Sequence, residues 1–256
     1  MYTLGIDIGS AASKAVILED GKNIVASKVI ASGTGTSGPI RVFEEVLVQA
    51  RIDAQDIVRM VATGYGRMTF KGVDRQISEI TCHARGVSHL VPTARTIIDI
   101  GGQDAKIIKI SDKGKVLNFL MNDKCAAGTG RFLEVMSRVL ETTVDQLGSL
   151  GSKSAKAAAI SSTCTVFAES EVISQLAAGI LKEDIAAGVH QAVARRVAGL
   201  ARRVGIEEDV ILTGGVAQNP GVLEALGKQL KTMVKSAPIP QFTGALGAAI
   251  IAWEEL

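Results

Sequence analysis

The sequence predicts an α/β protein that is built from two similar lobes. A chain of 256 residues has room for one large domain or for two domains of about 100–150 residues each. The chain is 47% hydrophobic and contains 27 glycines, which suits many tight turns between strands and helices. One strand–turn–strand pattern also occurs twice. Because a repeat marks copies of one structural unit, we expect two lobes of the same fold.

Each copy of the repeat is a predicted β-hairpin with an aspartate at the end of its first strand. The first copy reads IDIG and, after four further residues, lysine; it contains Asp7 and Lys14. The second copy reads the same way and contains Asp99 and Lys106, so both positions recur after 92 residues (7 to 99 and 14 to 106). Runs of β-branched residues flank both glycine turns, which predicts strand, tight turn and strand.

The two turns have the composition of a phosphate-binding site. Glycine lets a phosphate approach the backbone closely, and the N–H groups of such a turn form a nest for an anion. The aspartates would hold a hydrated Mg²⁺ on those phosphates, and Lys14 would reach a phosphate. The alternative for Lys14 and Lys106 is a position on the solvated surface. Alternatively, the two segments are ordinary hairpins in which aspartate and glycine only form the turns. The candidate nucleotide-binding residues here are Asp7, Gly9, Ser10, Ser13, Lys14, Asp99, Gly101, Gly102 and Gln103.

A third glycine cluster follows in the segment VILTGGVAQNP. A strand leads to Gly214 and Gly215, and a helix is predicted to start at Asn219, because asparagine is a good N-cap and Pro220 suits the first helical position. The space left by the paired glycines would admit a flat adenine ring, so Gly214, Gly215 and Asn219 are also candidate nucleotide-binding residues. A strand followed by two glycines and a helix is also common in proteins that bind no nucleotide. The position of this segment after the two hairpins is therefore what favours nucleotide binding.

This order of motifs resembles the acetate kinase, sugar kinase, Hsp70 and actin superfamily. The resemblance covers the whole chain and implies two ribonuclease H-like lobes with a nucleotide cleft between them. It also implies two helices that cross between the lobes, around residues 78–90 and 244–253. We expect the first lobe to comprise residues 1–90 with a returning segment 243–256. The second lobe would comprise residues 91–242, with the adenosine loop and the cysteine motifs.

Two of the three cysteines stand before helical patterns. Apolar residues recur at helical spacing after Cys125 (from Phe132) and after Cys164 (from Val172 through Leu181). A thiol close to the N-terminus of a helix is favoured as thiolate, the form that binds iron. The alternative is a buried cysteine that packs as a small apolar residue. Two thiolates are too few for a cluster that needs four, but a two-fold dimer would supply four.

The segments KCAAGTGRFLE and STCTVFAESEVIS are similar to the cysteine motifs of the ATP-dependent activators of 2-hydroxyacyl-CoA dehydratases. The segments LGIDIGSAASKAVI, IDIGGQDAK and TGGVAQNPGV match the same family, which is grouped with the ATPase subunits of benzoyl-CoA reductase. The resemblance implies an ATPase coupled to electron transfer. It also implies a homodimer that binds ATP or ADP with Mg²⁺ and shares one 4Fe–4S cluster through Cys125 and Cys164. Cys82 has no ligand role in that family.

The resemblance also implies the partners of this chain. A reduced ferredoxin or flavodoxin would donate one electron, and a dehydratase component with its own iron–sulfur cluster would receive it. Candidates for positioning the hydrolytic water are Asp99, Gln103, Asp104 and Glu79. The alternatives are a small-molecule kinase of the sugar type without a cluster, with Asp104 as general base, and a module in which ATP only sets the conformation.

Composition excludes several other classes. The formal charge is only +2 and the basic residues are spread along the chain, so we expect no nucleic-acid partner; the pairs 195–196 and 202–203 would lie on a solvated helix face. No apolar stretch reaches about 18 residues, and the N-terminus lacks the pattern of a signal peptide. The odd number of cysteines argues against a disulfide framework. Together with the missing signal-peptide pattern, it predicts a cytoplasmic protein with reduced thiols. His83, His89 and His190 are expected in surface or core roles.

Overall fold

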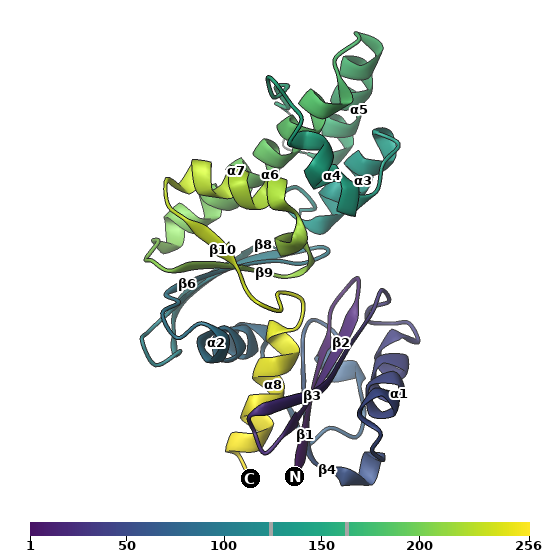
Figure 1. Cartoon of the computed structure of the whole chain (residues 1–256), viewed down its shortest axis with the longest axis vertical. Helices are drawn as coiled ribbons and strands as arrows, with labels where there is room; N and C mark the ends of the chain where they lie inside the picture. The colour runs from purple at the N-terminus through teal and green to yellow at the C-terminus, as the bar shows by residue number, and fades with distance from the viewer. Residues whose placement is uncertain (123–124, 162–163) are drawn as a thin grey trace.

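The computed structural model describes residues 1–122, 125–161 and 164–256. Figure 1 shows two lobes, each centred on one β-sheet, with α2 (Glu79–Leu90) and α8 (Thr243–Glu254) between them. Both termini lie at the end of the first lobe, and the helices α3 (Gly130–Val139), α4 (Val144–Gly151) and α5 (Thr165–Ala177) lie at the opposite end of the molecule. The predicted α/β fold of two lobes is confirmed.

In the described residues, the first sheet has five strands in the order β3-β2-β1-β4-β5. They are β1 (Tyr2–Ile8), β2 (Ser13–Glu19), β3 (Asn23–Ile30), β4 (Ile57–Thr63) and β5 (Arg75–Gln76). β1 and β2 pair as an antiparallel hairpin, and β4 runs parallel to β1 on its other side. The apolar side chains of β2 alternate between two covered faces, whereas those of β1 pack on one face and Gly5 of β1 abuts α8 on the other, so both faces of β1 are covered.

The second sheet repeats this arrangement. Its five strands in the described chain have the order β10-β9-β6-β7-β8, with β6 in the position of β1. They are β6 (Thr96–Ile100), β7 (Ala105–Ile110), β8 (Val116–Asn122), β9 (Val210–Thr213) and β10 (Val234–Ser236). In the two hairpins Asp7 faces Lys14 and Asp99 faces Lys106 in the strand register. The hairpins predicted from the repeat are therefore confirmed.

Helices cover both faces of each sheet. The remaining ones are α1 (Gly38–Ala50), α6 (Lys182–Val204) and α7 (Pro220–Leu230), with short 3₁₀ turns η1 (Ala54–Asp56), η2 (Arg67–Thr69) and η3 (Gly215–Gln218). α1 packs on one face of the first sheet and α8 on the other. α6 and α7 pack on one face of the second sheet, and α2 packs on the other. None of the described helices is both long and apolar enough to cross a bilayer.

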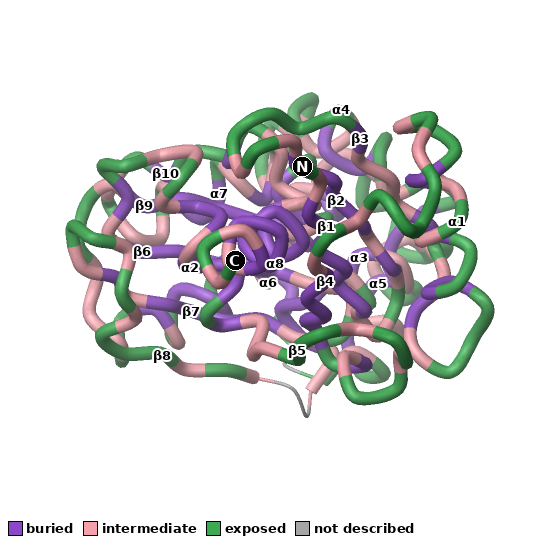
Figure 2. The backbone as a smooth tube through the Cα atoms, turned by 90° about the horizontal axis from the view of Figure 1, so that it is seen from below, coloured by how far each residue is buried: buried purple, intermediate pink, exposed green. Residues whose placement is uncertain are grey.

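The crossing helices α2 and α8 touch backbone to backbone. A Cβ atom at Gly86 would collide with the carbonyl oxygen of Thr243, and one at Gly247 would collide with that of Cys82. Figure 2 shows α8 as mostly buried. Both predicted crossing helices are confirmed. The division of the chain into residues 1–90 with 243–256 and 91–242 stays a prediction, since α2 packs its apolar residues against the second sheet as well.

The helix after Cys164 is shorter than the apolar spacing predicts. α5 ends at Ala177, and Gly179 has a positive φ of 81°, a conformation that ends helices and that glycine adopts without strain. A new helix, α6, starts at Lys182. The apolar side chains of Ile173, Ile180 and Leu181 are exposed instead of forming one buried helix face, so that part of the prediction is wrong.

Candidate functional site

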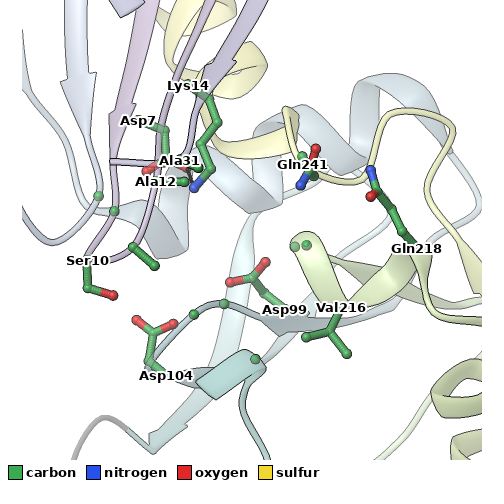
Figure 3. Close-up of a pocket in the computed structure, with 18 of the residues that line it drawn as sticks. Asp7, Ser10, Ala12, Lys14, Ala31, Asp99, Asp104, Val216, Gln218 and Gln241 are labelled. Atoms are coloured by element: carbon green, nitrogen blue, oxygen red, sulfur yellow. Dashed lines mark hydrogen bonds and ion pairs between the residues drawn. The ribbon is translucent and has the colours of Figure 1, made fainter. Parts of the chain in front are cut away.

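A cavity of about 420 Å³ lies between the two lobes. Figure 3 shows that Asp7, Ser10 and Lys14 enter it from the first hairpin, while Asp99 and Asp104 enter it from the second. The residues predicted for nucleotide binding or hydrolysis that line this cavity are Asp7, Gly9, Ser10, Lys14, Glu79, Asp99, Gly101, Gly102, Asp104, Gly214, Gly215 and Asn219. The fold therefore gathers both hairpins and the third glycine cluster around one space. The roles assigned to these residues stay predictions.

Two predicted residues lie elsewhere. Ser13 is fully buried, and its hydroxyl donates a hydrogen bond to the carbonyl oxygen of Ser32 at 2.8 Å. Gln103 is exposed, and neither residue is among those described as lining the cavity. Ser13 thus braces the base of the first hairpin in the structure, and Gln103 lies at the outside of the second turn.

Both hairpin turns are closed in the same way. The amide of Gly9 donates to the carbonyl oxygen of Ala12 at 3.0 Å, and the amide of Gly101 donates to that of Asp104 at 3.0 Å. The tips of the two turns meet, because a Cβ atom at Gly102 would lie 2.5 Å from the Cβ atom of Ala11. Glycine at this position lets the hairpins approach each other across the cavity.

The carboxylate of Asp99 is buried and held from several sides. Its Oδ1 accepts a hydrogen bond from the hydroxyl of Thr213 at 2.8 Å, and its Oδ2 lies 3.3 Å from Lys106 Nζ and 3.7 Å from His83 Nε2. Burial alone would raise the pKa of Asp99. His83, Lys106 and the Thr213 hydrogen bond lower that pKa below its usual range, so the group is ionised at neutral pH.

Lys106 is a buried cation, which excludes the interpretation as a solvated surface residue. Its Nζ lies 3.3 Å from Asp99 Oδ2 and 2.9 Å from Asp104 Oδ2. Burial would lower the pKa of Lys106, but Asp99 and Asp104 raise it above its usual range. Burial raises the pKa of Asp104, although Lys106 opposes this shift. In the first lobe Lys14 Nζ lies 3.3 Å from Asp7 Oδ2, so each aspartate has a lysine partner across its hairpin.

The crossing helix α2 contributes two side chains to the cavity. Glu79 Oε2 accepts a hydrogen bond from Arg67 Nη1 at 3.0 Å, and the same nitrogen donates to the carbonyl oxygen of Gly64 at 3.0 Å. His83 follows Glu79 by four residues, which places both on one face of the helix. The sequence interpretation missed His83. The i, i+4 pair on a helix expected to cross between lobes was the signal that could have found it.

The third glycine cluster forms a bend above the cavity. Gly214 has a φ of 84°, and a Cβ atom there would collide with the carbonyl oxygen of Ile100. Asn219 caps α7, since its side-chain oxygen accepts a hydrogen bond from the amide of Val222 at 3.1 Å. The predicted helix start is therefore confirmed. The amide side chains of Gln218 and Gln241 lie at this end of the cavity (Figure 3), and neither was singled out in the sequence.

The cysteines differ in burial. Cys164 is exposed and is the N-cap residue of α5, as expected, whereas Cys125 is half-buried and residues 126–129 separate it from α3. Cys82 is buried, and burial raises the pKa of its thiol to about 12. In residues 1–122, 125–161 and 164–256, no group of three or more metal-binding side chains comes together.

The loop that follows Cys125 is attached to the second hairpin. The amide of Gly130, at the start of α3, donates a hydrogen bond to the carbonyl oxygen of Gly101 at 2.9 Å. The next amide, that of Arg131, donates to the carbonyl oxygen of Gly102 at 2.8 Å. α3 in turn packs against α5, which begins directly after Cys164. A displacement of the hairpin turn would therefore displace the start of α3 with it.

The chain is similar to known proteins over almost its whole length. The chain is 61% identical over 254 residues to the activator of lactoyl-CoA dehydratase from Anaerotignum propionicum, covering 99% of this chain and 98% of the relative. It is 57% identical over 256 residues to the (R)-2-hydroxyglutaryl-CoA dehydratase activating ATPase from Acidaminococcus fermentans, covering 100% of this chain and 98% of the relative.

Two solved structures are also similar. The activator of the 2-hydroxyisocaproyl-CoA dehydratase from Clostridium difficile with bound ADPNP has a TM-score of 0.98 and 55% identity, covering 100% of this chain and 95% of that chain. A ROK family glucokinase from Streptomyces griseus, with a TM-score of 0.60 and 16% identity over 99% and 100% of the two chains, shares the fold alone. Residues 4–252 match a single family. The chain belongs to the BadF/BadG/BcrA/BcrD ATPase family.

Proposed function

We propose that this chain is an ATPase that activates a 2-hydroxyacyl-CoA dehydratase by delivering one electron to it. The observation that carries the proposal is the pair of hydrogen bonds between the second hairpin turn and the start of α3, because they connect the candidate nucleotide site to a cysteine loop. Relatives at 61% and 57% identity are dehydratase activators, and one of them is an activating ATPase. The alternative of a small-molecule kinase is not favoured, since the similarity to the glucokinase, at 16% identity, extends only to the fold.

The cleft suits ATP with a hydrated Mg²⁺. Asp7 and Asp99 come from facing hairpins, and each is buried beside one lysine. Mg²⁺ keeps several waters and takes one or two carboxylates plus phosphate oxygens, so two carboxylates on opposite walls match its requirements. The turns at Gly9 and Gly101 line the cavity, and their amides that are not used to close the turns would face the phosphates, while the bend at Gly214 and Gly215 would leave space for the base.

Cys125 and Cys164 fit a shared 4Fe–4S cluster. Both thiols are accessible, and the loops that carry them precede helices that pack together. One described chain assembles no set of three or more ligands, whereas a two-fold dimer would provide four thiolates. When bound, such a cluster supplies a one-electron donor at low potential. A 4Fe–4S cluster on the dimer axis and Mg²⁺ in each cleft are therefore part of the proposal.

The chain's own residues would couple the two sites. ATP drawn between the hairpins holds the turn at Gly101 and Gly102 against the first lobe, and the turn carries the amides of Gly130 and Arg131 with it. The loop of Cys125 is attached to the same helix start, so its position and solvent exposure change with nucleotide state. Exposure and hydrogen bonding to the sulfurs are the means by which a protein sets a cluster potential.

The proposed partners follow from the activator function. A dehydratase component with its own iron–sulfur cluster would accept the electron, and a ferredoxin or flavodoxin would supply it. Among the candidates for positioning the hydrolytic water, Glu79, Asp99 and Asp104 line the cavity. Asp99 is fixed in place by a hydrogen bond from Thr213 and an ion pair with Lys106. A cytoplasmic location, expected from the unpaired cysteines, stays a prediction.

The test is ATP-dependent activation of a dehydratase under strictly anoxic conditions. The purified chain, a reduced flavodoxin or ferredoxin and an inactive 2-hydroxyacyl-CoA dehydratase component are mixed with or without Mg·ATP, and dehydration is followed. We expect activity only with ATP, and none when Cys164→Ser replaces the wild type. Cys82→Ser is the matched control, because its thiol is buried away from the cysteine loops, and it should activate normally. Dehydration that is independent of ATP, or phosphorylation of a sugar instead, would contradict the proposal.

A further inference from the structure

We propose that His83 is a positioning residue that ties the carboxylate of Asp99 to the start of α8, so that the two crossing helices set where Asp99 stands for ATP hydrolysis. This inference rests on the proposed ATPase function and deepens it. It assigns a role to a side chain that the sequence interpretation left as a core or surface histidine.

His83 makes contacts in two directions. It lies in α2, only 5% exposed, one helical turn after Glu79. Its Nδ1 lies 2.9 Å from the hydroxyl oxygen of Thr243, the first residue of α8, where either atom can donate the hydrogen bond. Its Nε2 lies 3.7 Å from Asp99 Oδ2, within ion-pair distance. The imidazole therefore bridges one crossing helix and the strand β6 of the second hairpin.

The other hydrogen-bond and ion-pair partners of Asp99 come from the second lobe, although the charge of Lys14 in the first lobe also lowers the pKa of Asp99. Thr213 ends β9 and Lys106 lies in β7, and both strands pair directly with β6. These contacts move with the second sheet when the lobes move. Among the described side chains, His83 connects Asp99 to the crossing helices α2 and α8. The position of Asp99 can therefore depend on the angle between these two helices.

The first-lobe carboxylate is close to the same point. A Cβ atom at Gly244, the second residue of α8, would lie 3.1 Å from Asp7 Oδ2 and 3.2 Å from His83 Nε2. Asp7 Oδ2 and His83 Nε2 thus border one small space that only a glycine leaves open. His83 Nε2 therefore lies near both Asp99 of the second lobe and Asp7 of the first, the two carboxylates proposed to hold the hydrated Mg²⁺.

The crossing itself lies one turn further along the helix. Gly86 of α2 abuts the carbonyl oxygen of Thr243, the residue whose hydroxyl meets His83. A rotation of α8 against α2 at this contact therefore moves Thr243, and the hydrogen bond passes that movement to His83. The atoms that meet at this contact belong to Thr243 and Gly247 and not to the glycines proposed to hold the phosphates and the base. Loss of His83 should consequently reduce turnover more than nucleotide affinity.

Two amide substitutions separate the two contacts. An asparagine amide nitrogen can stand in for Nδ1 and a glutamine amide nitrogen for Nε2, so His83→Asn keeps the Thr243 contact and His83→Gln keeps the reach to Asp99. We expect His83→Asn and His83→Leu to lower kcat for ATP hydrolysis about tenfold, as for the loss of a close electrostatic contact with a buried carboxylate. His83→Gln should stay within about threefold of wild type, and KM for ATP should change less than about twofold in every variant. Thr243→Val removes the same contact as His83→Gln and should lower kcat by the same small factor of at most about threefold, whereas Thr243→Ser, which keeps the hydroxyl, should not lower it.

A second readout does not depend on turnover. The dissociation constant of ADP and the Mg²⁺ concentration that gives half of its thermal stabilisation are measured on the anoxic dimer. We expect His83→Asn to raise the required Mg²⁺ concentration several-fold while Tm without nucleotide stays near that of wild type. Wild-type kcat in His83→Leu, or equal losses of kcat and Tm in the asparagine and glutamine variants, would overturn the inference.

The wild type separates this inference from the proposed function. A wild-type chain that hydrolyses Mg·ATP but fails to activate a dehydratase contradicts the activator function alone, and the split between the asparagine and glutamine variants still decides the role of His83. A wild-type chain without any hydrolysis would overturn both.

Discussion

At the scale of single residues, the site depends on pairs that a seven-residue spacing creates. Asp7 with Lys14, and Asp99 with Lys106, are register partners across antiparallel hairpins, so each carboxylate meets one lysine at 3.3 Å. The pattern was visible in the sequence because both contacts are local. Burial of Lys106 between Asp99 and Asp104 was not visible in the sequence, since it depends on the tertiary packing around the cavity.

Gly102 provides a prediction at this scale. Its φ is not in the left-handed region, so alanine there would meet no backbone strain and would be hindered only by the Cβ atom of Ala11 at 2.5 Å. Gly102→Ala should keep the hairpin tips apart and reduce ATP hydrolysis about tenfold, because a small misplacement of phosphate-positioning groups is costly. Hydrolysis by the purified variant checks this.

The matched control removes the obstacle on the other side. The double variant Ala11→Gly with Gly102→Ala restores the space between the tips, so its hydrolysis rate should recover most of the loss. A double variant as slow as Gly102→Ala would show that the contact between the tips is not what limits the reaction.

Among the helices and strands, those that depend on contacts between residues close in sequence were predicted correctly. Both hairpins, the strand before Gly214 and the cap at Asn219 were predicted from turn residues, periodicity and capping, whereas the crossing helices were expected from the family resemblance. The early end of α5 at Ala177 was missed because apolar spacing continues to Leu181 while Gly179 turns the backbone. A side chain that enters the cavity from a loop distant in sequence, such as Gln241, could not be placed, since only tertiary packing brings it there.

The contact of α6 with α4 and α7 predicts a pH dependence of stability. His190 of α6 is buried between Gly151 and Gly221, and burial lowers its pKa to about 4, with Glu224 opposing the shift. The unfolded chain takes up this proton below about pH 6.5 while the folded chain stays neutral, so stability is lost as pH falls from 6.5 to about 4. Between pH 7 and pH 5 this group should cost about 2 kcal/mol of the free energy of unfolding.

Urea unfolding at both pH values measures this loss, with His190→Gln as the control. The glutamine variant starts less stable, but it should lose less stability between pH 7 and pH 5 than the wild type does. Parallel losses in the two proteins would contradict a neutral buried imidazole.

At the scale of the whole molecule, the account depends on contact between the nucleotide cleft and the cysteine loops. The cleft is formed by both lobes, and the cysteine loops precede helices at the far end of the second lobe (Figure 1). The turn at Gly101 and Gly102 is the shared element, because it borders the cavity and accepts the amides of Gly130 and Arg131. Nucleotide state can therefore reach the cysteines without a change inside either sheet.

Gly130 tests this connection. A Cβ atom there would lie 3.1 Å from the carbonyl oxygen of Gly101, so Gly130→Ala should push the start of α3 away from the turn. Alanine is also the better helix former, by about 1 kcal/mol, so the helix itself should not weaken. We expect dehydratase activation per ATP hydrolysed to fall about tenfold, measured by following both reactions in one anoxic assay. An unchanged ratio would remove the turn as the link.

The most direct measurement is iron and acid-labile sulfide in anoxically purified protein of known mass. The account predicts a species of twice the 26.7 kDa of one chain that holds about four irons and about four sulfides, and that loses them in Cys125→Ser or Cys164→Ser but not in Cys82→Ser. An iron-free, colourless protein that still activates a dehydratase with ATP would contradict it.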